Sequence, residues 1–312
     1  MTEAELIADG GLAASSAEFF RSPGFLEAEG TTHSLRIGLN DGELIAPLVV
    51  REIEGGGRLD AISPYGYPGL AIGGGPSLPV SPAEIDFSGT GLVTVFLRHS
   101  LGGDPPLAGA TPRNVCLLSD PALDRKSRMS DRQQIRKNIK RGYEMEFVPG
   151  PESPPEARAG FHRAYTETME RTSAAERYFF TEEYFDLILS SERTWLALAR
   201  DADGVIAAAS IAAASDGMLH YYLSGTADSN LRDSPMKNVI EAMIEFAAEM
   251  DLPLNLGGGI TPGDPLEEFK RGFANREEQW FTSELICDPA AYEALSPPGA
   301  GEYFPAYRAP AA

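Results

Sequence analysis

The segment from His220 to Asn275 constrains the fold more than any other part of this 312-residue chain. It begins with an aromatic, strand-like run and passes through a polar turn into a helix whose apolar residues recur at helical spacing. Those residues are Val239, Ile240, Met243, Ile244 and Ala247. Pro253 ends the helix, a short apolar strand follows, and three glycines, 257–259, open a loop. The sequence therefore predicts a strand–helix–strand unit that leads into a glycine-rich turn.

This order resembles the acyl-binding half of an N-acetyltransferase-like (GNAT-like) domain. CoA-dependent proteins of that fold hold a pyrophosphate on the backbone N–H groups of a glycine-rich turn at the helix start. The corresponding turn here, Asn230 to Pro235, has no glycine. It carries the carboxylate of Asp233 and ends in a proline, which has no N–H to donate. The expectation is this fold without a CoA site and without any other cofactor.

Five motifs occur in one order along most of the chain. They are Ser63–Gly69, Arg132–Gly142, Tyr221–Gly225, Leu256–Gly259 and Asp264–Phe273. With these motifs the chain resembles the Fem-type (FemABX-like) aminoacyl-tRNA-dependent peptidyl transferases. The resemblance implies an α/β (α+β) fold with two GNAT-like domains, mixed sheets flanked by helices, no CoA and, in this chain, no coiled-coil arm. The predicted domains are residues 1–128, completed by 288–312, and residues 129–287.

A basic island interrupts an otherwise acidic protein. The chain has 46 acidic and 26 basic residues, a formal net charge of −20. Between Arg125 and Arg141 there are eight basic residues and one acidic residue, Asp131, a local net charge of +7. Such a contrast predicts a phosphate-binding surface, with a solvated helix face as the alternative. The Fem-type resemblance favours the acceptor arm of aminoacyl-tRNA, bound by Arg125, Lys126, Arg128, Arg132, Arg136, Lys137, Lys140 and Arg141.

The same stretch predicts a helix. Ser130 and Gln133 match a capping box, and Gly142 is a natural C-terminal stop. We expect Ile135 and Ile139 to face the interior. The outer face then carries three cations at i, i+4 and i+8, namely Arg132, Arg136 and Lys140.

The chemistry implied by the resemblance is aminolysis of an activated ester. That reaction needs an amine held near the carbonyl, a path for its proton and stabilisation of the oxyanion, but no protein nucleophile. The family places a Phe-Lys pair at the reaction centre, and Phe269 and Lys270 match it. The resemblance therefore assigns electrostatic stabilisation to Lys270 and the shaping of the pocket to Phe269. The alternatives are a surface lysine and a core aromatic side chain.

The residues expected to bind the acceptor amine come from several motifs. They are Tyr65, Tyr67, Arg177, Tyr178, Tyr221, Tyr222 and Asp264. Tyr65 and Tyr67 lie in a loop that Gly and Pro make rigid, which presents side chains to a ligand or is simply a packed turn. Neighbouring Tyr221 and Tyr222 should face opposite sides of one strand. Asp264 either caps the following helix or orients the amine.

The Fem-type resemblance implies arginines and lysines that bind a UDP-linked acceptor, and these have no clear match in the first fifty residues. Only Arg21 and Arg36 are available there for a UDP-linked precursor. This favours transfer to a small peptide in natural-product (peptidyl nucleoside antibiotic) biosynthesis, such as that of pacidamycin. Formation of the peptidoglycan interpeptide bridge remains the second version. An acyl-CoA-dependent N-acyltransferase and a non-catalytic binding module also stay open.

Composition limits the remaining possibilities. There is no run of eighteen apolar residues and no signal-peptide pattern at the N-terminus, so we expect a cytoplasmic protein without membrane insertion. We also expect a monomer that does not bind DNA. Cys116 and Cys287 lie in apolar stretches and are expected to be buried free thiols. The four histidines lack ligand spacing, so no metal site is expected. Residues 40–42, Asn-Asp-Gly, predict a hairpin near the N-terminus.

Overall fold

The structure is a computed structural model that describes residues 2–55, 57–259, 261–297 and 303–309. The chain forms two compact units. Unit 1 consists of residues 1–15, 29–113 and 279–312, and unit 2 of residues 16–28 and 114–278. The chain thus changes unit at residues 113/114 and 278/279, whereas the predicted boundaries lay at 128/129 and 287/288. Residues 16–28 also belong to unit 2, although the sequence placed them in the first domain.

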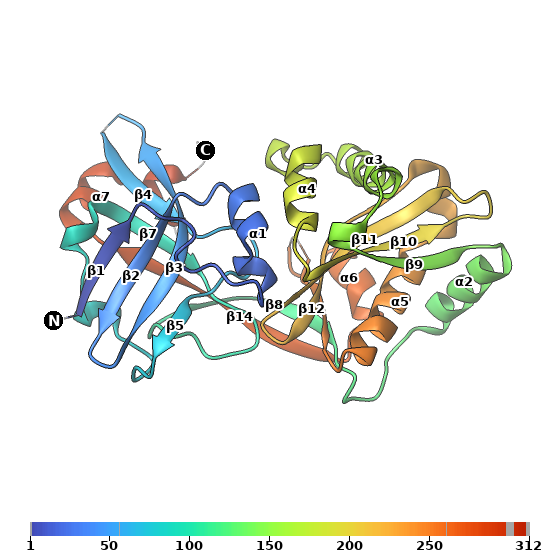
Figure 1. The fold of residues 1–312 in the computed structure, drawn as a ribbon, viewed down its shortest axis with the longest axis horizontal. Coiled ribbons are helices and arrows are strands. Elements are labelled where there is room, and N and C mark those ends of the chain that lie inside the picture. Colours follow the sequence, from blue (N-terminus) through green and yellow to red (C-terminus); the bar gives the residue numbers. More distant parts are fainter. Residues whose placement is uncertain (1, 56, 260, 298–302, 310–312) are drawn as a thin grey trace. The chain divides into compact units, whose positions relative to one another are not determined.

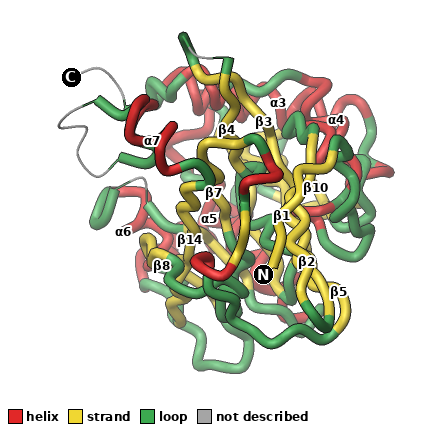
Figure 2. Tube along the Cα trace, turned by 90° about the vertical axis from the view of Figure 1, so that its left-hand side faces the viewer, coloured by secondary structure: helices red, strands yellow, loops and turns green. Residues whose placement is uncertain are grey.

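Unit 1 is built on a mixed sheet. Its elements are β1 (Thr2–Ile7), β2 (His33–Leu39), β3 (Gly42–Ile53), β4 (Arg58–Ile62), β5 (Ala71–Gly74), β6 (Ile85–Asp86), β7 (Leu92–Arg98), most of β14 (Arg276–Ile286) and α7 (Pro289–Leu295). The strand order is β6-β1-β2-β3-β4-β7-β14, with β5 paired to β3. The pairs β1–β6 and β4–β7 are parallel and the others antiparallel. Figure 2 shows β1 and β2 side by side in this unit.

The predicted hairpin is confirmed, because β2 and β3 pair from Leu39 and Gly42 outward. A buried carboxylate ties the C-terminal segment to this sheet. Asp60 on β4 is fully buried, and its oxygens accept from Arg51 Nε at 3.0 Å and from Arg308 Nε at 2.5 Å. The Tyr307 hydroxyl donates to the same carboxylate at 3.2 Å. Residues 303–309 are therefore held by a paired buried charge.

Unit 2 is a second mixed sheet covered by helices on both faces (Figure 1). Its elements are α1 (Pro23–Ala28), most of β8 (Thr111–Ser119), α2 (Met129–Lys140), β9 (Glu144–Pro149), α3 (Pro155–Arg171), α4 (Glu182–Leu189), β10 (Thr194–Arg200), β11 (Ile206–Ser215), β12 (Met218–Thr226), α5 (Met236–Glu249), β13 (Leu254–Gly257) and α6 (Pro265–Arg271). The strand order is β8-β13-β12-β11-β10-β9. Only β12 and β13 are parallel among the pairs described in this unit.

The strand β11 shows why helices cover both faces. All ten of its residues are buried, so neither face is available to water. Helices α3 and α4 pack on one face, while α5 packs on the other and α2 packs against α5 (Figure 1). The five apolar residues that predicted α5 are all buried there, which confirms the helical periodicity.

An aromatic cluster explains why residues 16–28 belong to unit 2. Phe19, Phe20 and Phe25 are fully buried. Their rings lie 5.3–6.5 Å from the ring of Tyr222 on β12, in edge-to-face arrangements. Three such rings remove far more apolar surface from water than a linker could, so this segment packs on unit 2.

The helix α2 ends where the sequence predicted, but it begins differently. Arg128 is the N-cap and makes no side-chain cap hydrogen bond, so the predicted capping box is wrong. Gly142 has φ +87°, as the predicted stop requires. Ile135 is buried, whereas Ile139 is 59 % exposed. Asn138 takes the inward place instead, because its side-chain amide bonds to α5 and to the turn that precedes α5.

Candidate active site

The strands β12 and β13 separate after two paired residues. Among the described residues their parallel register consists of Leu219↔Leu254 and His220↔Asn255. Beyond this point β13 passes into the glycine turn, while β12 continues along β11 to Thr226. One edge of β12 after His220 therefore has no strand partner in the described part of the chain.

A β-bulge at Tyr222 changes the direction of side chains in this part of β12. Ala212 on β11 pairs with Tyr221, and Ile211 pairs with Leu223, so Tyr222 is the extra residue. The bulge brings Tyr221 and Ser224 to the same face, although they are three residues apart. Ser224 Oγ donates to the Tyr221 hydroxyl at 2.5 Å. Burial raises the pKa of Tyr221 to about 12, so the phenol stays neutral.

Lys270 on α6 is directed into the space between the two strands. Only 8 % of the residue is exposed, and Nζ donates to the Gly258 carbonyl at 2.7 Å. The same nitrogen lies 6.0 Å from the centre of the Tyr221 ring, within cation–π range. Burial lowers the pKa of Lys270 to about 8, and the electrostatic effects of Cys116 and Asp264 oppose that shift. The alternative of an ordinary surface lysine is wrong.

The glycine turn near Lys270 restricts side chains at two of its positions for different reasons. Gly257 has φ +72°, a conformation that L-residues rarely adopt. A Cβ on Gly259 would lie 2.6 Å from the Asp264 carboxylate. The turn therefore approaches the start of α6 closely, and glycines allow the backbone carbonyl of Gly258 to reach the lysine.

Asp264 is the N-cap of α6. Its carboxylate accepts from the backbone N–H of Glu267 at 2.7 Å and from that of Thr261 at 3.0 Å. The capping role is thus confirmed. Phe269 packs against Phe273, with ring centroids 5.7 Å apart, and against the core of unit 2. The core alternative accounts for its contacts.

The other predicted acceptor residues of unit 2 make contacts of their own. Tyr222 faces the aromatic cluster, opposite to Tyr221, as expected, and its hydroxyl lies 3.2 Å from that of Tyr184. Arg177 stacks on the neighbouring Tyr178 at 4.9 Å in a 3₁₀ turn between α3 and α4. The hydrogen-bond and cation–π contacts described for Lys270 are with Gly258 and Tyr221, so the acceptor role of these three residues stays a prediction.

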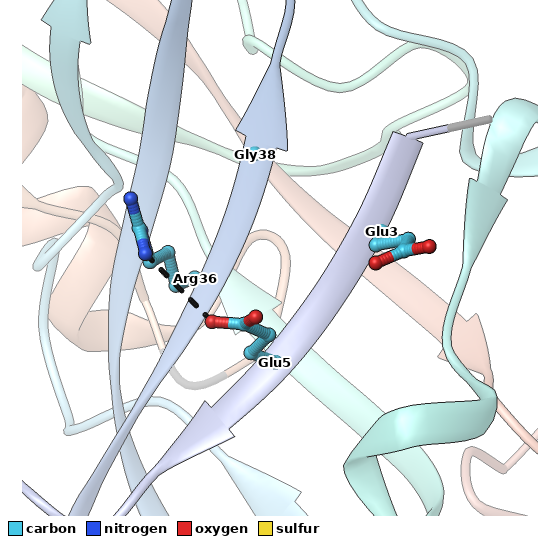
Figure 3. A pocket seen from close by; sticks show the side chains of 4 residues that line it. All are labelled: Glu3, Glu5, Arg36 and Gly38. Carbon is cyan, nitrogen blue, oxygen red and sulfur yellow. Dashed lines mark ion pairs between the residues drawn. The ribbon is translucent and has the colours of Figure 1, made fainter.

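Tyr65 and Tyr67 belong to unit 1. Tyr65 is 45 % exposed, and its backbone N–H donates to Glu29 Oε2 at 2.8 Å. Tyr67 packs edge-on against Trp280 at 5.8 Å. A depression of about 260 Å³ in the same unit is lined by Glu3, Glu5, Arg36 and Gly38 (Figure 3). It contains none of the predicted site residues.

The basic island divides into paired and unpaired cations, all of them exposed. Arg125 pairs with Glu241 at 2.7 Å, Arg128 with Glu268 at 3.1 Å, and Arg141 with Asp233. Arg132 donates to Ser127 at 3.0 Å. Within the residues that the structure describes, the remaining four cations have no ion-pair partner and are Lys126, Arg136, Lys137 and Lys140.

The inner face of α2 is fixed to α5 by polar contacts. Asp131, 5 % exposed, accepts from Lys237 Nζ at 2.8 Å, and Asn138 Nδ2 donates to Asn238 Oδ1 at 2.7 Å. Asn138 Nδ2 also donates to the Asp233 carbonyl at 2.8 Å. These buried contacts orient the helix so that the unpaired cations face water.

Sequence reasoning missed several residues around Lys270. Cys116 on β8 is a buried free thiol, as predicted, but its electrostatic effect on the lysine was not foreseen. His220 and Asn255, each 2 % exposed, also went unnoticed. A polar residue in the middle of an apolar strand is the signal that could have found them.

Comparisons with known proteins bear on the fold. Residues 125–271 match the family model described as the acetyltransferase (GNAT) domain. The crystal structure of FemX is similar to this chain with a TM-score of 0.58 and 11 % identity, over 84 % of this chain and 89 % of that one. The structure of L-PGS from Bacillus licheniformis has a TM-score of 0.55 and 14 % identity, over 82 % and 84 %.

A third similar structure is the C-terminal domain (DUF2156) of a putative lysylphosphatidylglycerol synthetase from Agrobacterium fabrum, with a TM-score of 0.55 and 13 % identity over 89 % and 88 %. At such identities the likeness shows the fold. No curated protein matches the sequence. The predicted fold class is confirmed: GNAT-like domains with mixed sheets flanked by helices.

Within the described ranges, none of the helices combines the length and the apolarity that crossing a bilayer requires. In the same residues, no three His, Cys, Asp or Glu side chains gather in a way that could hold a metal ion.

Proposed function

We propose that this protein transfers an aminoacyl group from aminoacyl-tRNA to the amine of a peptide acceptor. The observation that carries the proposal is Lys270, a buried ammonium at the open end of the β12–β13 pair. Preorganised positive charge in a site with little water stabilises a developing oxyanion far more than the same charge in water.

The proposed reaction needs only what this arrangement offers. The neutral acceptor amine attacks the ester carbonyl of the aminoacyl-tRNA, and a C–N bond forms while the carbonyl oxygen becomes negative. The intermediate collapses, the ester C–O bond breaks, and the proton lost by the amine ends on the departing ribose oxygen. Lys270, held by Gly258 at 2.7 Å, would stabilise the oxyanion, and a pKa of about 8 leaves most of it protonated at pH 7.

The unpaired cations of α2 support tRNA as the donor. Arg136, Lys137 and Lys140 lie together near the C-terminal end of the helix, exposed and without ion-pair partners among the described residues. The chain has a formal charge of −20, so a group of cations that its acidic residues do not neutralise is a candidate surface for binding a polyanion. The Fem-type motifs support the same donor.

The free edge of β12 supports a peptide as the acceptor. Beyond His220 this edge has no strand partner among the described residues, so an extended chain could add to it through backbone hydrogen bonds. Tyr221 and Ser224 would face such a peptide near Lys270. We favour a small natural-product peptide, with a peptidoglycan precursor as the second version. The names of FemX and of the lysylphosphatidylglycerol synthetase accord with aminoacyl transfer.

An acyl-CoA-dependent N-acyltransferase is the competing function, because the matching family model describes an acetyltransferase domain. The turn before α5 argues against it. The Asp233 carbonyl accepts from Gln134 at 2.9 Å and from Asn138 at 2.8 Å, and its carboxylate pairs with Arg141. The turn thus presents oxygens that already have partners, where a pyrophosphate would need N–H donors.

The decisive experiment is single-turnover transfer from a pool of charged tRNA to a panel of peptide amines. We expect a new amide product with charged tRNA and none with acetyl-CoA. Lys270→Met should lose turnover, while Arg271→Met, which removes an exposed cation one residue away, should keep it. Transfer from acetyl-CoA but not from tRNA would replace this proposal with the competing one.

A further inference from the structure

Two buried polar side chains form the last rung between β12 and β13. His220 Nδ1 lies 3.0 Å from Asn255 Nδ2, and His220 Nε2 lies 3.2 Å from the Ser215 carbonyl. These partners require the neutral imidazole that carries its proton on Nε2: the amide donates to Nδ1, and Nε2–H donates to the carbonyl. Burial lowers the pKa of His220 to about 4, so this form persists at neutral pH.

Asn255 connects this rung to the glycine turn. Its Oδ1 accepts from the Gly257 N–H at 2.8 Å. The carbonyl of the following residue, Gly258, accepts from Lys270 Nζ at 2.7 Å. Gly257 has no side chain to restrict its backbone, so the hydrogen bond that its N–H donates to Asn255 provides that restriction instead. One amide side chain therefore lies between the histidine and the peptide that holds the lysine.

His220 is itself held from the opposite side. The ring of Phe20 packs edge-on against the imidazole at 4.9 Å. Ser215, whose carbonyl receives the Nε2–H, bonds through Oγ to Glu18 Oε2 at 3.1 Å. The segment 16–28 thus contributes to the placement of the imidazole, and a continuous set of contacts leads from Glu18 to the lysine.

We propose that His220 and Asn255 are positioning residues that hold the glycine turn, and through it the Lys270 ammonium, in its place for the reaction. The role rests on the proposed function of Lys270. Neither side chain hydrogen-bonds to the lysine in the structure, so each acts through the backbone of the glycine turn, from the Gly257 N–H to the Gly258 carbonyl. A displacement of about 1 Å in a reacting group can lower a rate by about 10²-fold, which sets the scale of the expected effect.

The kinetic test compares Asn255→Leu, His220→Leu and His220→Gln. We expect the two leucine variants to lower single-turnover transfer by about 10- to 100-fold at saturating substrates, with little change in KM. Glutamine retains a donor and an acceptor, so His220→Gln should keep most of the rate. Ser210→Ala is the matched control, because Ser210 is fully buried in the same sheet and bonds to the Leu223 carbonyl, away from the turn. Its rate should equal that of the wild type.

A second readout does not depend on activity. In protein labelled at lysine Cε, NMR should show one lysine with a titration midpoint near 8, identified by its loss in Lys270→Met. In folded Asn255→Leu this midpoint should move upward, because the released ammonium reaches water. An unchanged midpoint, or a leucine variant that folds and reacts at the wild-type rate, would overturn the positioning role. If the leucine variants fail to fold, the test uses His220→Gln and Ser210→Ala. Equal transfer rates and equal lysine titration midpoints in these two variants support the positioning role. A transfer rate of His220→Gln as low as that of Lys270→Met overturns it.

The failure of the proposed function can be told apart from the failure of this inference. Wild-type turnover in Lys270→Met would refute the role of the lysine, while the NMR midpoint would still report whether Asn255 places it. Loss of turnover in Lys270→Met together with wild-type turnover in Asn255→Leu would refute the positioning role alone.

Discussion

The division of the basic island leads to a quantitative prediction about tRNA binding. One variant replaces Arg136, Lys137 and Lys140 by glutamine, and a matched variant replaces Arg125, Arg128 and Arg141 by glutamine. Both remove three positive charges from the same exposed stretch. They differ because the first set has no ion-pair partner among the described residues, whereas the second set pairs with Glu241, Glu268 and Asp233.

The expected magnitude follows from the number of phosphates that each set can neutralise. Each contact contributes about 0.9 to the slope of log K against log salt for a duplex, so losing three unpaired cations should lower the slope by about 2.7. Between 50 and 200 mM salt, the wild type should then lose about 40-fold more affinity than the variant does. The paired arginines already have carboxylate partners, and their loss should change the slope by less than about 1.

The assay is filter binding of purified tRNA across a salt series, with melting temperatures measured in parallel. The paired arginines are 41–47 % exposed, so each replacement should cost at most about 1 kcal/mol of stability. Equal slopes in the wild type and in the unpaired-set variant would refute the assignment of these cations to phosphate. A larger loss of slope in the paired set would show that the ion pairs open on binding.

Four further predictions concern single features. Lys270→Met should lower single-turnover transfer by about 10²-fold with little change in acceptor affinity, which a weaker affinity at unchanged turnover would contradict. The lowered pKa of Lys270 means that the unfolded chain binds more protons between about pH 8 and the usual value of 10.5. The free energy of unfolding should therefore rise with pH across that window. At pH 7, Lys270→Met should be more stable than the wild type by up to about 3 kcal/mol in free energy of unfolding, and above pH 10.5 this difference should vanish. Calorimetry with acetyl-CoA should show no micromolar binding, because Asp233 places oxygens in the turn and Pro235 has no N–H to donate, and a saturable signal would count against this. Asp60→Asn should destabilise unit 1 by about 3 kcal/mol in chemical unfolding, because it leaves Arg308 and its neighbours without their buried partner; an unchanged unfolding midpoint would refute this.

Local patterns were sufficient wherever one element decides the outcome by itself. The apolar spacing of α5, the Asn-Asp-Gly turn between β2 and β3, and the cap at Asp264 all lie where the sequence predicted them. Gly142 likewise ends α2. Each of these depends on the backbone preferences of a few consecutive residues, and those preferences do not change when the chain folds.

The helix α2 shows where local patterns stop being sufficient. The capping box was wrong, and Ile139 is exposed while Asn138 is buried. Asn138 is inward because its amide finds partners on Asn238 and Asp233, about a hundred residues later in the chain. A hydrophobicity pattern cannot anticipate a buried amide whose partners come from another element.

The sequence by itself determined that Lys270 follows a capped turn and that three glycines precede it. Only the tertiary structure decided that this lysine is buried, that its ammonium bonds to Gly258, and that Cys116 and Tyr221 lie near it. The reason is physical: burial and the pKa of a side chain depend on the elements that surround it, here β8, β12 and β13. These elements are distant in sequence and become neighbours through the strand order β8-β13-β12 of the sheet.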